Sequence, residues 1–143
     1  MPILTSHRPA ETEALGEKLG RAAKRGWVVA LTGELGAGKT QFVRGLARGL
    51  GIPGRVHSPT FTLVNEYVGG RLKLFHLDLF RLETPEQIFS AGVGEFLKPD
   101  GVAVVEWAER IYDLRFAICD LKTVQIEIMS ETERKIIYDD FGA

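Results

Sequence analysis

The glycine-rich run GELGAGKT at residues 33–40 constrains the fold of this chain more than any other segment. The residues before it, 27–31, are apolar and partly β-branched, which predicts a strand buried on both faces. Apolar residues recur after it at helical spacing, over 42–50, and predict an amphipathic helix. A buried strand, a glycine loop and a helix in this order indicate an α/β fold.

The spacing of this run matches G-x-x-x-x-G-K-[ST], which is typical of a phosphate-binding loop. Its glycines let backbone N–H groups approach phosphate oxygens with no Cβ in the way, and the N-terminus of the following helix favours anions. Lys39 supplies a cation for the β- and γ-phosphates, and the Thr40 hydroxyl is placed to coordinate Mg²⁺. The structural alternative is a glycine-rich turn between a strand and a helix.

A Mg²⁺ ion at Thr40 needs a carboxylate nearby, normally at the end of a buried strand. The apolar residues 102–105 predict such a strand, and Glu106 follows them at the edge where α/β sheets bind ligands. Asp78 is the second candidate, because alternation places it on the same strand face as His76. The spacing favours Glu106 as the metal ligand or water-orienting base, with Asp78 as the second carboxylate.

Each of these side chains also has a structural interpretation. A solvated strand end is the alternative for Glu106, and a hairpin salt bridge to Arg81 or Lys73 is the alternative for Asp78. His76 is interpreted as a half-buried histidine in preference to a base.

Two further features border the predicted site. Residues 58–61, SPTF, are placed to send a hydroxyl toward the γ-phosphate, and a plain turn entering a strand is the alternative. Trp107 either walls the site or belongs to the core. Arg44, Arg48 and Arg55 are interpreted as a solvated helix face, with an anionic partner as the alternative.

The rest of the chain predicts further helices and hairpins. Gly69-Gly70 is a two-residue hairpin signal, and Thr84-Pro85-Glu86-Gln87 has the form of a capping box. The expected elements are helices over 10–25 and 84–96, a hairpin of strands 60–68 and 71–80, and a final hairpin of strands 122–129 and 134–138. We therefore expect one α/β domain with a mixed sheet and antiparallel hairpin additions.

Length, charge and cysteine content exclude several classes of protein. The 143 residues suit a single domain, residues 1–143. The net charge of -1 does not favour nucleic acid or a membrane held by bulk charge, and the positive excess lies early, with +5 over residues 1–57 and -6 over 58–143. A single cysteine, Cys119, excludes an internal disulfide and a cysteine-rich structural zinc site. Because no apolar run is long enough to span a membrane, we expect a cytoplasmic protein.

Four segments together resemble the TsaE family, formerly YjeE: GELGAGKT at 33–40, SPTF at 58–61, HLDLFR at 76–81 and VEW at 105–107. Members are bacterial ATPases required for the threonylcarbamoyl-adenosine modification of tRNA. The phosphate loop is shared by many NTPases, whereas the other three segments are more particular to this family. The resemblance covers nearly the whole chain and implies a P-loop NTPase-like fold with a mixed sheet.

The resemblance also implies a ligand set, namely ATP or ADP with Mg²⁺, and slow ATP hydrolysis by the chain alone. The phosphates would be held by Leu35, Gly36, Ala37, Gly38 and Lys39. Thr40 and Glu106 would serve Mg²⁺, and Asp78 would assist at the metal or its water. Thr60 would be a switch-like hydroxyl, and Arg134 in the last hairpin would approach the nucleoside.

The implied partners are TsaB and TsaD, which form the complex in which TsaD transfers the threonylcarbamoyl group to adenosine 37 of tRNA. The chain would meet tRNA indirectly, through that complex. Two residues depart from the family: Phe80 stands where many relatives carry Tyr, and Ala108 stands where Pro commonly follows Glu-Trp. Neither residue belongs to the predicted phosphate-binding set, although Ala108 leaves the path of residues 107–120 open.

Other functional classes fit less well. A GTPase-like switch usually requires [NT]-K-x-D, and the nearest segment, residues 97–100, lacks the Asn or Thr. A small-molecule kinase would need more chain for an acceptor pocket and a lid. A binding module that uses ATP only to set its shape differs from an ATPase in turnover alone, so the sequence leaves that alternative open.

Overall fold

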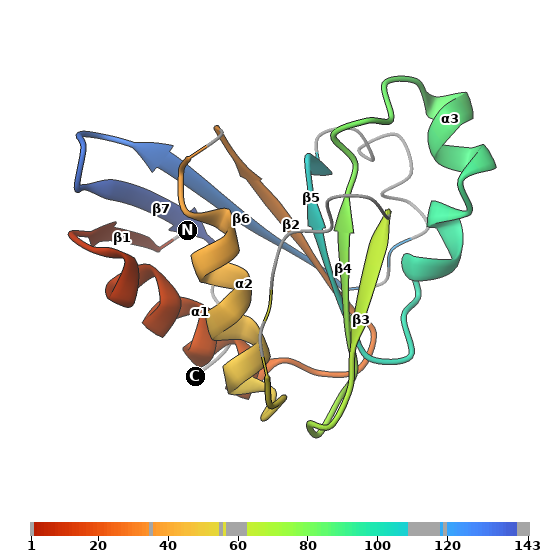
Figure 1. The fold of residues 1–143 in the computed structure, drawn as a ribbon, viewed down its shortest axis with the longest axis horizontal. Helices are drawn as coiled ribbons and strands as arrows, with labels where there is room; N and C mark the ends of the chain where they lie inside the picture. Colours follow the sequence, from red (N-terminus) through yellow and green to blue (C-terminus); the bar gives the residue numbers. More distant parts are fainter. Residues whose placement is uncertain are drawn as a thin grey trace.

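The computed structural model describes residues 2–34, 36–54, 56, 63–108, 118 and 120–139 (Figure 1). Its helices and strands alternate along most of the chain. In chain order they are β1 (Ile3–Ser6), α1 (Pro9–Ala22), β2 (Trp27–Gly33), α2 (Lys39–Gly49), β3 (Val64–Tyr67), β4 (Leu74–Asp78), α3 (Pro85–Ser90), the 3₁₀ helix η1 (Val93–Phe96), β5 (Val102–Glu106), β6 (Asp120–Ile128) and β7 (Arg134–Tyr138).

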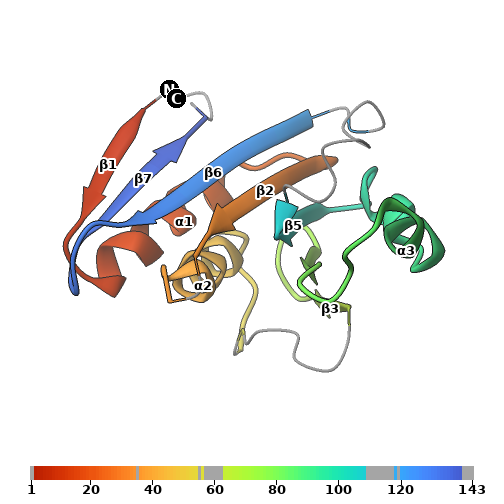
Figure 2. The ribbon, with the colours of Figure 1, turned by 90° about the horizontal axis from the view of Figure 1, so that it is seen from above.

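The strands form one mixed sheet with the order β1-β7-β6-β2-β5-β4-β3 (Figure 2). The four neighbours β6, β2, β5 and β4 run parallel to one another. The outer strands β7, β1 and β3 pair antiparallel, which confirms the mixed sheet with hairpin additions. Strands β2 and β5 lie in the middle, and their residues from Val28 to Leu31 and from Val102 to Val105 are almost completely buried, as two apolar runs predict.

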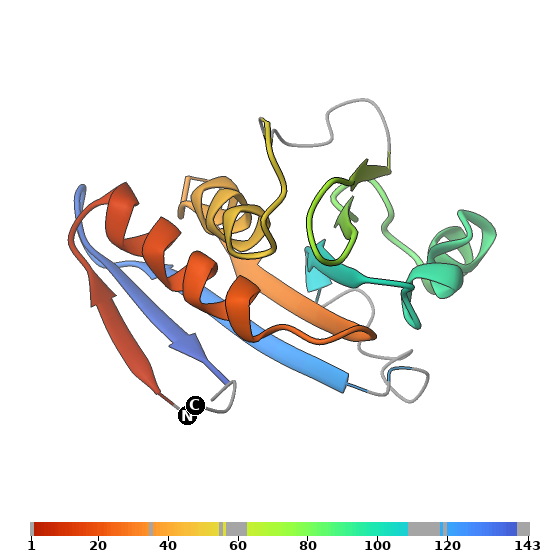
Figure 3. The same cartoon turned by 90° about the horizontal axis from the view of Figure 1, so that it is seen from below.

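Two helices cover one face of the sheet and a smaller layer covers the other. Helices α1 and α2 lie side by side on the first face (Figure 3), over a core that includes Leu19, Phe42 and Leu46. Helix α3 and η1 pack on the second face, where Ile88 and Val93 contact the alternate residues of β2, β4 and β5. The sheet is therefore shielded from water on both sides at its central strands β2 and β5.

The backbones of α1 and α2 are in direct contact at glycines. A Cβ on Gly45 would lie 1.9 Å from the carbonyl oxygen of Glu13, and a Cβ on Gly16 would lie 2.2 Å from that of Phe42. Such distances leave no room for any side chain, so glycine is required at both positions. The contact fixes the start of α2, which follows the glycine-rich loop, against α1.

The structure corrects the expected bounds of two helices. The first helix spans residues 9–22 instead of 10–25, and Ala23 after it is extended. The capping box of Thr84 and Gln87 is present as predicted, but the helix it opens stops at Ser90, because left-handed Gly92 follows and starts a separate 3₁₀ turn.

The middle hairpin is also shorter than expected. Its strands are β3 and β4, and residues 68–73 join them in place of a two-residue turn. Gly70 packs against the Leu50 carbonyl, and the Arg71 N–H donates to the same oxygen at 2.9 Å, so the connection is bound to the end of α2. The last hairpin has strands 120–128 and 134–138, close to the prediction, whereas residues 60–62 of the expected first strand lie outside the described residues.

Strand β1 is an element that the sequence does not predict. It pairs antiparallel with β7 at the edge of the sheet, with Ile3 opposite Ile137. The strand has four residues, and only Leu4 and Ser6 turn inward, so it offers a single inward apolar side chain. That is too little for an alternation signal.

Candidate functional site

The glycine-rich loop joins the end of β2 to the start of α2. Gly38 caps α2 with a φ of 100°, and Gly36 has a φ of 84°, both in the left-handed region that favours glycine. No atom lies within 4 Å of a Cβ built on either residue. The loop therefore has an open side, bordered by the N-terminus of α2, which suits a phosphate group. Leu35 lies outside the described residues.

Lys39 is the first residue of α2, and its side chain is buried beneath the loop. Its Nζ donates to the Gly33 carbonyl oxygen at 2.8 Å and lies 3.9 Å from Glu106 Oε1. The same nitrogen lies 4.9 Å from the centroid of the Trp107 ring. The ammonium group is thus held beside the cleft by a carbonyl, a carboxylate and an aromatic face.

The two predicted carboxylates end neighbouring strands. Asp78 and Glu106 are paired residues in the parallel register of β4 and β5, so both lie at the same edge of the sheet. Both line a cleft of about 670 Å³ together with Lys39, Thr40 and the loop glycines. Asp78 Oδ1 accepts the Phe80 N–H at 3.0 Å, and Lys73, a predicted partner of Asp78, pairs with Glu66 instead.

A histidine lies directly behind the Glu106 carboxylate. Nε2 of His76 is 2.5 Å from Glu106 Oε2, and the imidazole is completely buried. His76 shares a strand face with Asp78, as predicted, but it is fully buried where the sequence predicts a half-buried histidine, and its contact with Glu106 was not predicted. The register of β4 against β5 brings the His76 and Glu106 side chains together. The only sequence signal for this contact was that His76 and Asp78 lie on the same face of one strand.

Two aromatic side chains form one wall of the cleft. The Phe80 and Trp107 rings lie 5.2 Å apart, tilted by 51°, and both line the cleft. Trp107 adopts a φ of 59°, which is unusual for a residue with a side chain and aims its ring toward Lys39. Of the two interpretations of Trp107, the structure supports the wall, while Ala108 after it is fully buried.

A second pocket of about 300 Å³ adjoins the loop. It is lined by residues of the β1–α1 connection, by the turn between β6 and β7, and by Gly36, Gly38 and Gln41, which also line the cleft. Arg134 borders it, and its Nε and Nη2 donate to the carbonyl oxygens of Ala37 and Gly36 at 3.2 and 3.3 Å. The structure thus brings Arg134 next to the glycine-rich loop.

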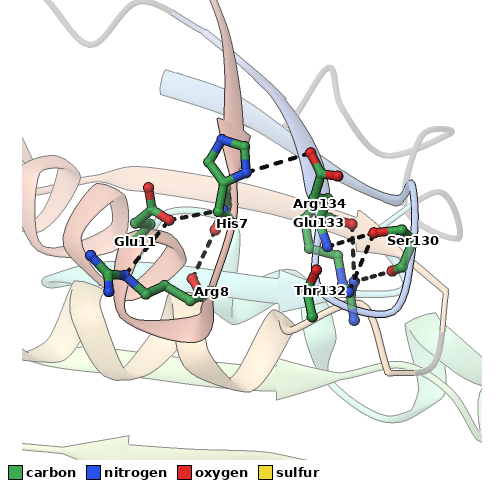
Figure 4. A network of polar contacts seen from close by, with 8 residues as sticks. His7, Arg8, Glu11, Ser130, Thr132, Glu133 and Arg134 are labelled. Carbon is green, nitrogen blue, oxygen red and sulfur yellow. Dashed lines mark hydrogen bonds and ion pairs between the residues drawn. The ribbon is translucent and has the colours of Figure 1, made fainter.

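The two walls of this second pocket are tied to each other (Figure 4). His7 Nδ1, from the β1–α1 connection, lies 3.4 Å from the Glu133 carboxylate in the β6–β7 turn. The His7 N–H donates to Glu11 in the first turn of α1, and Arg134 Nη1 donates to the Ser130 carbonyl oxygen at 2.8 Å. The His7–Glu133 contact thus joins the two walls, and the other two hydrogen bonds lie within one wall each.

The oxygen donors present fit a Mg²⁺ ion that arrives with a nucleotide. Within the described ranges, no three His, Cys, Asp or Glu side chains gather into a metal site. Mg²⁺ commonly takes one or two carboxylates, several waters and substrate phosphates, and does not need a cage of protein ligands. Thr40, Asp78 and Glu106 meet that requirement at the mouth of the loop.

Some of the other residues singled out in the sequence lie outside the described residues, and others have partners elsewhere in the chain. Thr60, with the SPTF segment, and Cys119 lie outside the described residues. Arg55 does too, whereas Arg48 pairs with Glu13 at 2.6 Å and Arg44 donates to the Val56 carbonyl oxygen at 3.3 Å. The two described arginines therefore have partners within the chain.

The sheet order, the glycine-rich loop and the carboxylates at the ends of β4 and β5 define a P-loop NTPase-like fold. A family model described as "Threonylcarbamoyl adenosine biosynthesis protein TsaE" matches residues 6–136. The chain belongs to the TsaE family.

Individual relatives agree with this assignment. A Synechocystis protein named tRNA threonylcarbamoyladenosine biosynthesis protein TsaE is 47% identical over 72% of this chain, and the protein of that name from Aquifex aeolicus is 42% identical over 88%. The matched part spans 68% of the Synechocystis protein, 86% of the Aquifex protein and 64% of the Bacillus subtilis relative. The crystal structure of Bacillus subtilis YdiB is similar with a TM-score of 0.79 and 34% identity, covering 99% of this chain and 86% of that one.

The part of the chain that the structure describes contains no helix long and apolar enough to cross a membrane.

Proposed function

We propose that this protein binds ATP and ADP with Mg²⁺, hydrolyses ATP slowly by itself, and acts in the threonylcarbamoyl-adenosine modification of tRNA through a TsaB–TsaD complex. The tRNA role rests on family membership and on the names of the relatives. We place the reaction in the cytoplasm and expect contact with tRNA only through the complex.

A single observation supports the nucleotide part of this proposal. The glycine-rich loop, Lys39, Thr40 and two carboxylates from separate strands line one cleft, although Lys39 and Glu106 are far apart in the sequence. A purely structural strand-to-helix turn does not need a buried lysine facing a buried glutamate. Phosphoryl transfer needs both, since a cation must neutralise the phosphates and a carboxylate must serve the metal or orient water.

Each residue has a defined part in this proposal. The backbone from Leu35 to Lys39 holds the phosphates, and Lys39 exchanges the Gly33 carbonyl for the β- and γ-phosphates. Thr40 and Glu106 serve Mg²⁺, which when bound neutralises charge on the transferred phosphate. Asp78 assists at the metal or its water.

Two more residues act at the ends of the nucleotide. Thr60 provides a hydroxyl for the γ-phosphate, and Arg134 borders the nucleoside in the second pocket, where it already contacts the loop. The base and sugar then lie between the start of α1 and the β6–β7 turn.

The first test is Mg²⁺-dependent ATP hydrolysis by the chain alone and with TsaB–TsaD added. We expect a low basal rate that rises with the partners and is lost in Lys39→Ala and Glu106→Ala. Lys24→Ala, which removes an exposed lysine away from the cleft, is the matched control and should keep the wild-type rate. If the partners neither bind nor change the rate, the proposed role in tRNA modification loses its support.

The same assay separates an ATPase from a binding module. ATP binding without turnover, alone and with the partners, would indicate that the nucleotide only sets the shape of the protein. Displacement of ATP by an equal concentration of GTP would revive the GTPase-like alternative.

A further inference from the structure

The Glu106 carboxylate is in a position that requires a permanent partner. Its side chain is only 6% exposed, at the end of the central strand β5. A buried carboxylate is costly unless hydrogen bonds or opposite charges satisfy it. Two groups approach it among the described residues, the Lys39 ammonium and the His76 imidazole.

Lys39 does not fix the direction of this carboxylate. Its Nζ is 3.9 Å from Oε1, beyond hydrogen-bond distance, and it already donates to the Gly33 carbonyl. In the proposed function, Lys39 also turns to the phosphates when a nucleotide binds. The contact that persists through this exchange is the one to His76.

The His76 imidazole makes the short contact, through one of its two ring nitrogens. Nε2 lies 2.5 Å from Glu106 Oε2, and because an ionised carboxylate only accepts hydrogen bonds, the imidazole tautomer that pairs with it has its hydrogen on Nε2. Nδ1 is buried and has no hydrogen-bond partner in the described part of the chain. An apolar side chain in this place would remove the unsatisfied Nδ1 but would leave Glu106 Oε2 without its hydrogen bond, so packing alone does not account for a histidine here.

The contact is built on rigid elements. His76 pairs with Val104 and Asp78 pairs with Glu106 in the β4–β5 register, so the histidine approaches the glutamate diagonally from the neighbouring strand. Both strands lie inside the sheet, with their neighbours on each side. A hydrogen bond from a neighbouring side chain to one carboxylate oxygen restricts a metal-binding carboxylate to one orientation.

We propose that His76 is a positioning residue that holds the Glu106 carboxylate through its Nε2 hydrogen, leaving Oε1 directed to the cleft for Mg²⁺. This inference rests on the proposed function, since it concerns the same site. It assigns to His76 a role in metal affinity and none in the affinity for the nucleotide without metal.

The test compares the dissociation constant of ADP with and without Mg²⁺, measured by titration calorimetry, in the wild type and in His76 variants. In His76→Gln, the side-chain amide nitrogen reaches the place of Nε2, and in His76→Asn the shorter side chain places it near Nδ1. We expect His76→Gln to keep most of the gain in ADP affinity that Mg²⁺ gives. His76→Asn and His76→Leu should lose roughly tenfold of this gain, with the affinity for metal-free ADP unchanged.

A second background shows whether His76 acts through Glu106. In Glu106→Gln, the further change His76→Asn should alter the Mg²⁺ gain by less than about twofold, because the carboxylate to be positioned is absent. Circular dichroism of each variant reports folding. If His76→Leu does not fold, the comparison of His76→Gln with His76→Asn remains valid.

The possible results are distinct. The positioning role is wrong, while the proposed function stands, if His76→Asn retains the Mg²⁺ gain as well as His76→Gln does. The same conclusion follows if His76→Asn reduces the gain as much in the Glu106→Gln background as in the wild type. If the wild type binds ADP with no gain from Mg²⁺, both this inference and the metal part of the proposed function are wrong.

Discussion

Arg134, the first residue of β7, donates from its Nε to the carbonyl oxygen of Ala37 in the glycine-rich loop, at a distance of 3.2 Å. Its Nη2 donates to the neighbouring Gly36 carbonyl at 3.3 Å. Strand β7 therefore supports the backbone of the proposed phosphate site through the Arg134 side chain.

The first prediction concerns this support. Arg134→Ala should weaken ADP binding about three- to tenfold, because the loop loses two hydrogen bonds and the second pocket loses part of its wall. Arg134→Lys should recover only part of the affinity, since one ammonium group does not reproduce the planar guanidinium geometry. Calorimetry measures both, and equal affinity for the wild type and Arg134→Ala would contradict the prediction.

The second prediction concerns the contact of α1 and α2. Gly45→Ala should destabilise the protein by about 2–4 kcal/mol, because the new methyl group meets the Glu13 carbonyl at 1.9 Å and the helices must move apart. Gly94→Ala is the matched control, since no atom lies within 4 Å of the added Cβ. Urea unfolding should show a change within about 0.5 kcal/mol for the control.

The third prediction concerns Arg71 in the β3–β4 connection. Its Nη2 donates to the carbonyl oxygens of Gly20, Arg21 and Ala23 at 2.6, 3.0 and 2.7 Å, and so caps the end of α1. Arg71→Ala should cost about 1–2 kcal/mol of stability in thermal or urea unfolding.

Arg25→Ala provides the comparison for that experiment. Arg25 is exposed and pairs with the exposed Asp100, so its loss should cost well under about 1 kcal/mol. Equal effects of the two substitutions would show that Arg71 contributes no more than a surface ion pair.

The fourth prediction uses the two tryptophans. ADP binding should change the fluorescence of Trp107, because Lys39 lies 4.9 Å from its ring and leaves it for the phosphates. Trp27→Phe should keep the signal, since Trp27 is buried in β2 beside Lys122, away from the cleft. A signal that persists in Trp107→Phe and vanishes in Trp27→Phe would reverse the assignment.

Much of the fold was predictable because the local signals agree with the tertiary structure. Two apolar runs became the central strands, and the Thr84 capping box began a helix where expected. Strand β1 was not predictable, because it is held at the edge by pairing with β7 more than by its own side chains. The length of the β3–β4 connection depends on Gly70 packing beneath Leu50, a contact that is distant in the sequence.

The candidate site was predictable to a similar extent. Parallel strands end at the same edge of a sheet, and this rule predicted that Asp78 and Glu106 lie at one edge. The loop motif predicted Lys39 and Thr40 beside them, and all four residues line one cleft. The contact of His76 with Glu106 required the β4–β5 register, which no local feature encodes. The roles of all the predicted site residues, Leu35 and Thr60 among them, remain predictions, as do the single domain over residues 1–143 and the ligands.

The glycine contact between α1 and α2 also limits how the two helices can move relative to each other when the proposed nucleotide binds. With backbone against backbone at Gly16 and Gly45, there is no intervening layer of side chains whose rearrangement would let one helix slide along the other. We therefore expect the loop side of the cleft to be the stationary half. If ATP and ADP bind as proposed, the structural difference between the two states should appear in the opposite half, where Phe80 and Trp107 follow the ends of β4 and β5.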